Sequence, residues 1–115
     1  MKYLLLLFFV APGLSATAQT QLEMNQEAAD SMKIADAEMT LLYRKAVAKQ
    51  DAAGRKLLLD AQRKWIRYKE AHCKAVAQAY DKGSMQPMVF CHCITELTRE
   101  RADKLKRYSN EGGIY

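Results

Sequence analysis

The spacing of apolar residues is the feature that most restricts the fold of this 115-residue chain. From position 28 onward, apolar residues recur at alternating spacings of four and three, which places them on one face of an α-helix. No segment alternates with the two-residue period of a β-strand. The first stripe consists of Ala28, Met32, Ala35, Met39, Leu42 and Ala46. It predicts a helix from about Thr20 to Lys49.

Two further stripes follow, separated by turn signals. The stretch "QDAAG" contains Asp51, which can cap a helix, and Gly54, which weakens one locally. The stretch "DKGSMQP" supplies Gly83 for a helix C-terminus and Pro87 for a helix start. The second stripe comprises Leu58, Ala61, Trp65, Tyr68, His72, Ala75 and Ala79, and the third comprises Phe90, Ile94, Leu97, Arg101, Leu105 and Tyr108. We therefore predict an all-α fold, a small bundle of three helices, or of four if the first or second breaks.

The N-terminus predicts a cleaved secretory signal over residues 1–18. Lys2 precedes an apolar run from Tyr3 to Val10, and small residues occupy positions 16 and 18. The run is shorter than the ~20 residues of a spanning helix. With cleavage after Ala18, residues 19–108 form the helical domain and residues 109–115 a frayed polar tail. We expect a periplasmic or secreted protein with no transmembrane segment after cleavage.

The charge balance narrows the class of partner. The chain has 18 Lys and Arg against 13 Asp and Glu; removing Lys2 with the signal leaves 17 against 13, a net charge of +4. This modest excess is compatible with an anionic lipid, glycan or protein as partner. Basic and acidic residues are interleaved along the predicted helices, so we expect no nucleic acid partner.

Three cysteines in an oxidising compartment predict one disulfide and one spare thiol. Around the third helix, Cys91 and Cys93 lie about 80° to either side of the apolar stripe, and His92 points away from it. His72 falls within the second stripe, as a core histidine, and does not converge with His92, so we predict no metal site and no cofactor. Cys73 can bond to either Cys91 or Cys93, closing a loop of about 20 residues. The spacing does not choose between the two pairings. A third pairing, Cys91 with Cys93, would form a small ring that is more typical of a redox-active loop than of a structural bond.

Arg101 interrupts the apolar face of the third helix. An unpaired guanidinium is costly there, so Arg101 must reach solvent or find a carboxylate. Asp36, beside the first stripe, is the partner that we predict. No nucleophile, base or phosphate-binding loop occurs at a recognisable spacing, so we predict a protein that binds rather than an enzyme. A thiol or metal-handling role rests on "CHC" alone and is the least favoured alternative.

Three stretches resemble the LprI-like family, small secreted helical domains named after a mycobacterial lysozyme inhibitor. They are "LDAQRKWIRYKEAHC" (59–73), "GSMQPMVF" (83–90) and "CITELTRER" (93–101), and residues 20–46 resemble the first helix of the family. The resemblance implies a disulfide from Cys73 to Cys93 and leaves Cys91 as the free thiol. The chain departs from the family pattern at Glu27, because members of the family commonly have a cysteine at this position. It also selects Gln62, Arg63 and Trp65 on the second helix as candidate binding or structural residues.

The function that the resemblance implies is binding and restraint of a lysozyme or related cell-wall hydrolase. Common lysozymes are basic, so a protein with a net charge of +4 lacks favourable long-range steering unless a local acidic patch faces the enzyme. The alternative is a binding module for an anionic envelope component, either lipid or glycan. That alternative depends on the excess of Lys and Arg over Asp and Glu.

Overall fold

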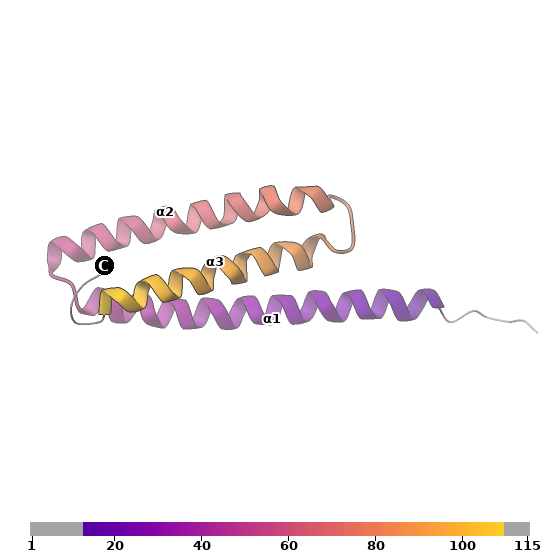
Figure 1. Ribbon diagram of the computed structural model, residues 1–115, viewed down its shortest axis with the longest axis horizontal. Coiled ribbons are helices and arrows are strands. Elements are labelled where there is room, and N and C mark those ends of the chain that lie inside the picture. Colours follow the sequence, from indigo (N-terminus) through magenta and orange to yellow (C-terminus); the bar gives the residue numbers. More distant parts are fainter. Residues whose placement is uncertain (1–12, 110–115) are drawn as a thin grey trace, which may run out of the picture.

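The structure, a computed structural model, describes the backbone of residues 13–109 and the side chains of residues 20–109. This part of the chain contains three helices, α1 (Gly13–Ala48), α2 (Ala52–Ala77) and α3 (Gln86–Ser109), and a short 3-10 turn, η1 (Gln78–Tyr80). The prediction of an all-α fold is confirmed. Figure 1 shows the helices side by side, with α3 between α1 and α2. No helix in the described range is long and apolar enough to cross a membrane.

Helix α1 is longer than predicted, because it begins at Gly13 rather than near Thr20. Its N-terminal end projects beyond the turn that joins α2 to α3 (Figure 1). The predicted apolar stripe is confirmed: Ala28, Ala35, Met39 and Ala46 are buried, and Met32 and Leu42 are half-buried. Residues 1–12, which hold most of the predicted signal peptide, and residues 110–115, which hold most of the predicted tail, lie outside the described residues.

The two connections form where the turn signals predict them. Asp51 caps α2, since its carboxylate accepts a hydrogen bond from the Gly54 amide at 2.8 Å. At the other end of the molecule, Lys82 has a positive φ of 61° and Gly83 donates a hydrogen bond from its amide to the Tyr80 carbonyl at 2.9 Å. A side chain at Gly83 would meet that carbonyl oxygen 3.1 Å from its Cβ. The close approach explains why glycine suits this position.

Helix α3 is covered on two sides, which the single predicted stripe did not anticipate. Ile94 and Leu105 from that stripe are buried, and Phe90, Leu97, Arg101 and Tyr108 are half-buried. A second buried line consists of Cys91, Thr95, Thr98 and Ala102. These residues are small, as are the buried alanines of α1. Small contact residues let two helix backbones approach closely, and α1 and α3 pack along much of their length.

The buried face of α2 differs from the predicted stripe. The buried residues are Leu58, Gln62, Lys69, Cys73 and Ala77, with Trp65 half-buried. The predicted core histidine, His72, is exposed and stacks on Tyr68 with ring centroids 5.5 Å apart. The predicted stripe included the aromatic rings at positions 68 and 72, which lie on an exposed face of α2. The face that packs against α3 is the neighbouring one, which carries Cys73. Cys73, which is not a member of the predicted stripe, is buried and forms a disulfide with α3.

Candidate binding site

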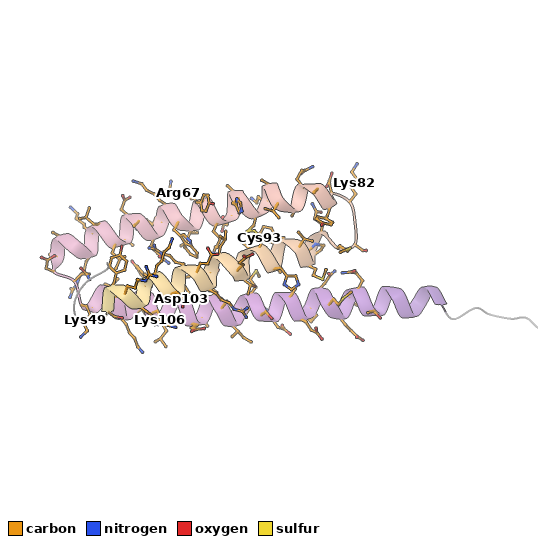
Figure 2. All side chains as sticks on the ribbon, in the orientation of Figure 1. Lys49, Arg67, Lys82, Cys93, Asp103 and Lys106 are labelled. Carbon is orange, nitrogen blue, oxygen red and sulfur yellow. A yellow bond between two sulfur atoms is a disulfide. The ribbon has the colours of Figure 1, made fainter. Side chains whose placement is uncertain are left out.

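A disulfide joins α2 to α3 through Cys73 and Cys93, whose Cα atoms are 5.5 Å apart. This is the pairing that the family resemblance implies. Figure 2 shows Cys93 in the space between the two helices. Cys91 is a free thiol, but it is buried rather than peripheral to the stripe, and burial raises its pKa. A buried thiol is poorly placed to form a bond to a second molecule.

Arg101 lies at the centre of a cluster between α2 and α3. Its Nε donates a hydrogen bond to Oε1 of Gln62 at 2.9 Å, and the Gln62 amide nitrogen in turn contacts the sulfur of Met39 at 3.0 Å. The guanidinium carbon of Arg101 lies 5.8 Å from the centre of the Trp65 ring, and Nζ of Lys69 lies 4.5 Å from the same ring centre. Two cations therefore lie close to one indole, a favourable arrangement for cation–π attraction.

The predicted pair of Arg101 and Asp36 does not form. Asp36 is exposed on α1, and the partner of Arg101 is the neutral Gln62. The prediction is wrong because it placed Arg101 against α1, whereas the Nε of this side chain reaches α2. Arg63 is exposed and lies outside the cluster. Of the five polar or aromatic candidates chosen from the sequence, the structure brings together Gln62, Trp65 and Arg101.

The cluster opens into a hollow of about 190 Å³ between α2 and α3. We call it the Trp65 hollow. Two cationic side chains and one carboxylate line it, together with two aromatic rings and an aliphatic side chain. The lining residues are Trp65, Tyr68, Leu97, Glu100, Arg101 and Lys104.

The cations around the Trp65 hollow have no acidic partner among residues 20–109. The ion pairs in that range are Asp60 with Lys64 and Asp103 with Lys106, both on exposed surface. Figure 2 labels Asp103 and Lys106 near the C-terminal end of α3. Burial lowers the pKa of Arg101, and electrostatic interaction with Tyr108 and Tyr43 opposes this effect. Nη2 of Arg101 is buried and has no hydrogen-bond partner in the described part of the chain.

A second surface lies on the exposed side of α1, about 120° around the helix axis from the buried stripe. It is a line of exposed residues at spacings of four and three, which we call the outer stripe. Its members are Glu23, Glu27, Asp30, Ile34, Glu38 and Leu41. Ile34 is 67% exposed and Leu41 52% exposed. Four carboxylates beside two exposed aliphatic side chains make this part of α1 acidic, although the chain as a whole is basic and exposed Lys45 follows Leu41 at the same spacing.

The histidines and the acidic side chains are spread over the surface of the described helices. Within residues 20–109, no group of three His, Cys, Asp or Glu side chains is placed to hold a metal ion. His92 is exposed on the surface of α3. Sequence reasoning missed two features of the site, Lys69 and the outer stripe. Both follow from helical spacing: Gln62, Lys69 and Cys73 share one face of α2, and the members of the outer stripe, acidic and aliphatic together, repeat at intervals of three and four.

Fold and site together define a small, disulfide-linked, all-helical domain. A family model described as "Lysozyme inhibitor LprI" matches residues 14–105. The chain therefore belongs to the LprI family. It is also similar to "Uncharacterized protein R02472" of Rhizobium meliloti (strain 1021), with 34% identity over 102 residues, covering 77% of this chain and 73% of that protein. No solved structure matches the chain.

Proposed function

We propose that this protein is a non-catalytic binding protein of the cell envelope that restrains a lysozyme or a related cell-wall hydrolase. The observation that carries the proposal is membership of the LprI family, whose description names lysozyme inhibition and whose match extends over residues 14–105. The predicted signal peptide agrees with it, because export brings the protein to the compartment where such hydrolases act.

The outer stripe of α1 removes the main physical objection to this function. A net charge of +4 repels a basic enzyme at long range, but association depends on the surface that faces the partner. Glu27, Asp30 and Glu38 give that surface a negative charge, and exposed Ile34 and Leu41 supply apolar area beside these carboxylates. Interfaces commonly combine an apolar centre with a charged rim. We propose that the outer stripe contacts the hydrolase.

The test is inhibition of lysozyme by the oxidised mature chain and two charge-reversed variants. Glu27→Lys with Glu38→Lys neutralises the outer stripe, whereas Glu70→Lys with Glu96→Lys makes the same change of net charge on α2 and α3, also at exposed positions. The first variant should inhibit about tenfold or more weakly than the second, because the acidic surface that attracts a basic enzyme is then lost. Equal inhibition by the two variants would remove the outer stripe as the contact surface.

A second candidate function is binding of an anionic envelope component. It is favoured by α2, whose sequence carries seven Lys and Arg against two Asp and Glu. Exposed basic residues on one helix attract anionic lipid or glycan, and this attraction weakens steeply as salt rises. Sedimentation with anionic vesicles or cell-wall glycan at low and high salt tests it. Retention that does not depend on salt, or no retention at low salt, contradicts this candidate.

A further inference from the structure

The Trp65 hollow combines features that one class of ligand would satisfy together. Its aromatic walls, Trp65 and Tyr68, offer flat apolar surface, and Tyr68 is 57% exposed. Its cations, Arg101 and Lys104, are not paired with a carboxylate in the described part of the chain. Ligand sites typically present such an apolar lining with a few converging polar groups. A ligand that carries a negative charge on a ring would match both the aromatic walls and the unpaired cations.

Arg101 is the strongest reason to expect an anion there. Its side chain lines the hollow, its Nε is used by Gln62, and its Nη2 is enclosed without a partner among residues 20–109. Guanidinium groups withdrawn from water are usually paired, because desolvation of a charge is costly. A carboxylate is a small anion that can accept a charge-assisted hydrogen bond from Nη1, the guanidinium nitrogen that is neither bonded to Gln62 nor enclosed.

Lys69 adds to the positive field around the indole, since its Nζ lies 4.5 Å from the centre of the Trp65 ring. Glu100, also in the lining, acts in the opposite direction by repelling an anion. The cations still outnumber the carboxylate around the hollow. A larger hollow of about 420 Å³ at the α2–α3 turn, lined by Lys74 and Phe90 among others, has a single exposed cation and is a weaker match.

The size of the Trp65 hollow limits the ligand. Pockets for drug-sized molecules run from about 300 to 1,000 Å³, and this hollow is about 190 Å³. It therefore suits a small molecule or one end of a longer one. We propose that the Trp65 hollow binds a small carboxylate carried on a ring, with Arg101 pairing with the carboxylate and Trp65 and Tyr68 packing against the ring. This binding is separate from any contact with a hydrolase through the outer stripe.

The experiment uses the indole N–H resonance of the ¹⁵N-labelled mature chain. Trp65 is the single tryptophan in the sequence, so that resonance reports on this hollow alone. Sodium glucuronate and sodium benzoate are titrated at constant ionic strength, with glucose and benzyl alcohol as uncharged counterparts. The proposal expects a saturable shift with at least one acid and a much weaker response to its neutral counterpart. Saturation with glucuronate alone identifies a sugar acid, and saturation with benzoate alone identifies an aromatic acid.

Three variants assign the binding to the hollow. Arg101→Gln should weaken binding about tenfold or more, since a charge-assisted pair is lost. Lys104→Gln, at an exposed position that leaves the fold intact, should weaken it about two- to threefold, and Glu100→Gln should strengthen it by a similar factor. Arg99→Gln, exposed on the same helix but outside the lining, is the matched control. Absence of a saturable shift with both acids, equal shifts from their neutral counterparts, or equal affinities for Lys104→Gln and Arg99→Gln would each overturn the proposal.

Discussion

Loss of the disulfide between Cys73 and Cys93 should destabilise the domain more than any single surface change. The bond closes a loop with a sequence separation of 20. In the chain-entropy model a loop of this length stabilises the folded state by about 3 kcal/mol. For a domain of about 100 residues, each 1 kcal/mol shifts Tm by about 4 °C or more, so Tm should fall by about 12 °C or more.

The structure of α2 makes this prediction specific to one helix. Helices α1 and α2 contact each other little, so α2 is held mainly through α3. Beyond Leu58, Ala77 and half-buried Trp65, α2 contributes few apolar side chains to the core. Loss of the bond should therefore loosen α2 before it unfolds α1 and α3.

The assay is thermal unfolding of the Cys73→Ala, Cys93→Ala double variant, followed by far-UV circular dichroism and by Trp65 fluorescence. In the variant, the fluorescence transition should precede the loss of helical signal. Reductant should lower Tm of the wild type toward that of the double variant and leave the variant unchanged. A double variant that melts at the wild-type temperature, or a wild type insensitive to reductant, would refute the reasoning.

Further predictions follow from the cluster and from the free thiol. Arg101→Ala should lower the free energy of unfolding by about 2 kcal/mol, measured by urea denaturation, because it leaves buried Gln62 without its hydrogen bond and removes a cation from Trp65. Asp36→Ala, which the sequence alone would predict to be equally damaging, should change stability by less than about 0.5 kcal/mol. Cys91 should react slowly with a thiol reagent in the folded state and rapidly in urea; fast reaction without denaturant would show that the thiol is accessible. Burial raises the pKa of the Cys91 thiol above its value in the unfolded chain. The resulting stability is fully present below the pKa of the unfolded state and is lost as pH rises through the pKa of the folded state. Cys91→Ala should therefore flatten the alkaline decline in Tm, and an equal decline in both proteins would contradict this assignment.

The sequence predicts α1 better than α2 for a physical reason. The buried stripe of α1 is made of aliphatic side chains and alanines, whose spacing alone identifies the buried face. On α2 the aromatic rings at positions 68 and 72 have the same spacing on a neighbouring face, so the spacing alone is compatible with two different buried faces. The disulfide at Cys73 decides between them. Spacing left that bond open between Cys91 and Cys93, and the family resemblance pointed to Cys93.

The polar part of the site depends on tertiary contacts that no local pattern contains. Arg101 was expected to seek the opposite charge of Asp36, but α2 places the neutral side chain of Gln62 within reach. Lys69 was not predicted to be part of the site, because a lysine is buried only where its aliphatic stem can pack while its charge lies over an aromatic ring, as it does at Trp65. Gln62, Trp65 and Arg101 were all named from the sequence. Their convergence on one hollow follows from the rotation of α2.

Inhibition of a lysozyme is tested most simply by residual lysozyme activity on bacterial cell walls, titrated with the oxidised mature chain. We expect stoichiometric loss of activity, with the Glu27→Lys, Glu38→Lys variant weaker as an inhibitor by about tenfold or more than the Glu70→Lys, Glu96→Lys control. Full lysozyme activity at a large excess of the protein, against several types of lysozyme, would contradict it. The fold and the family would then stand, and binding of an anionic envelope component would become the leading function.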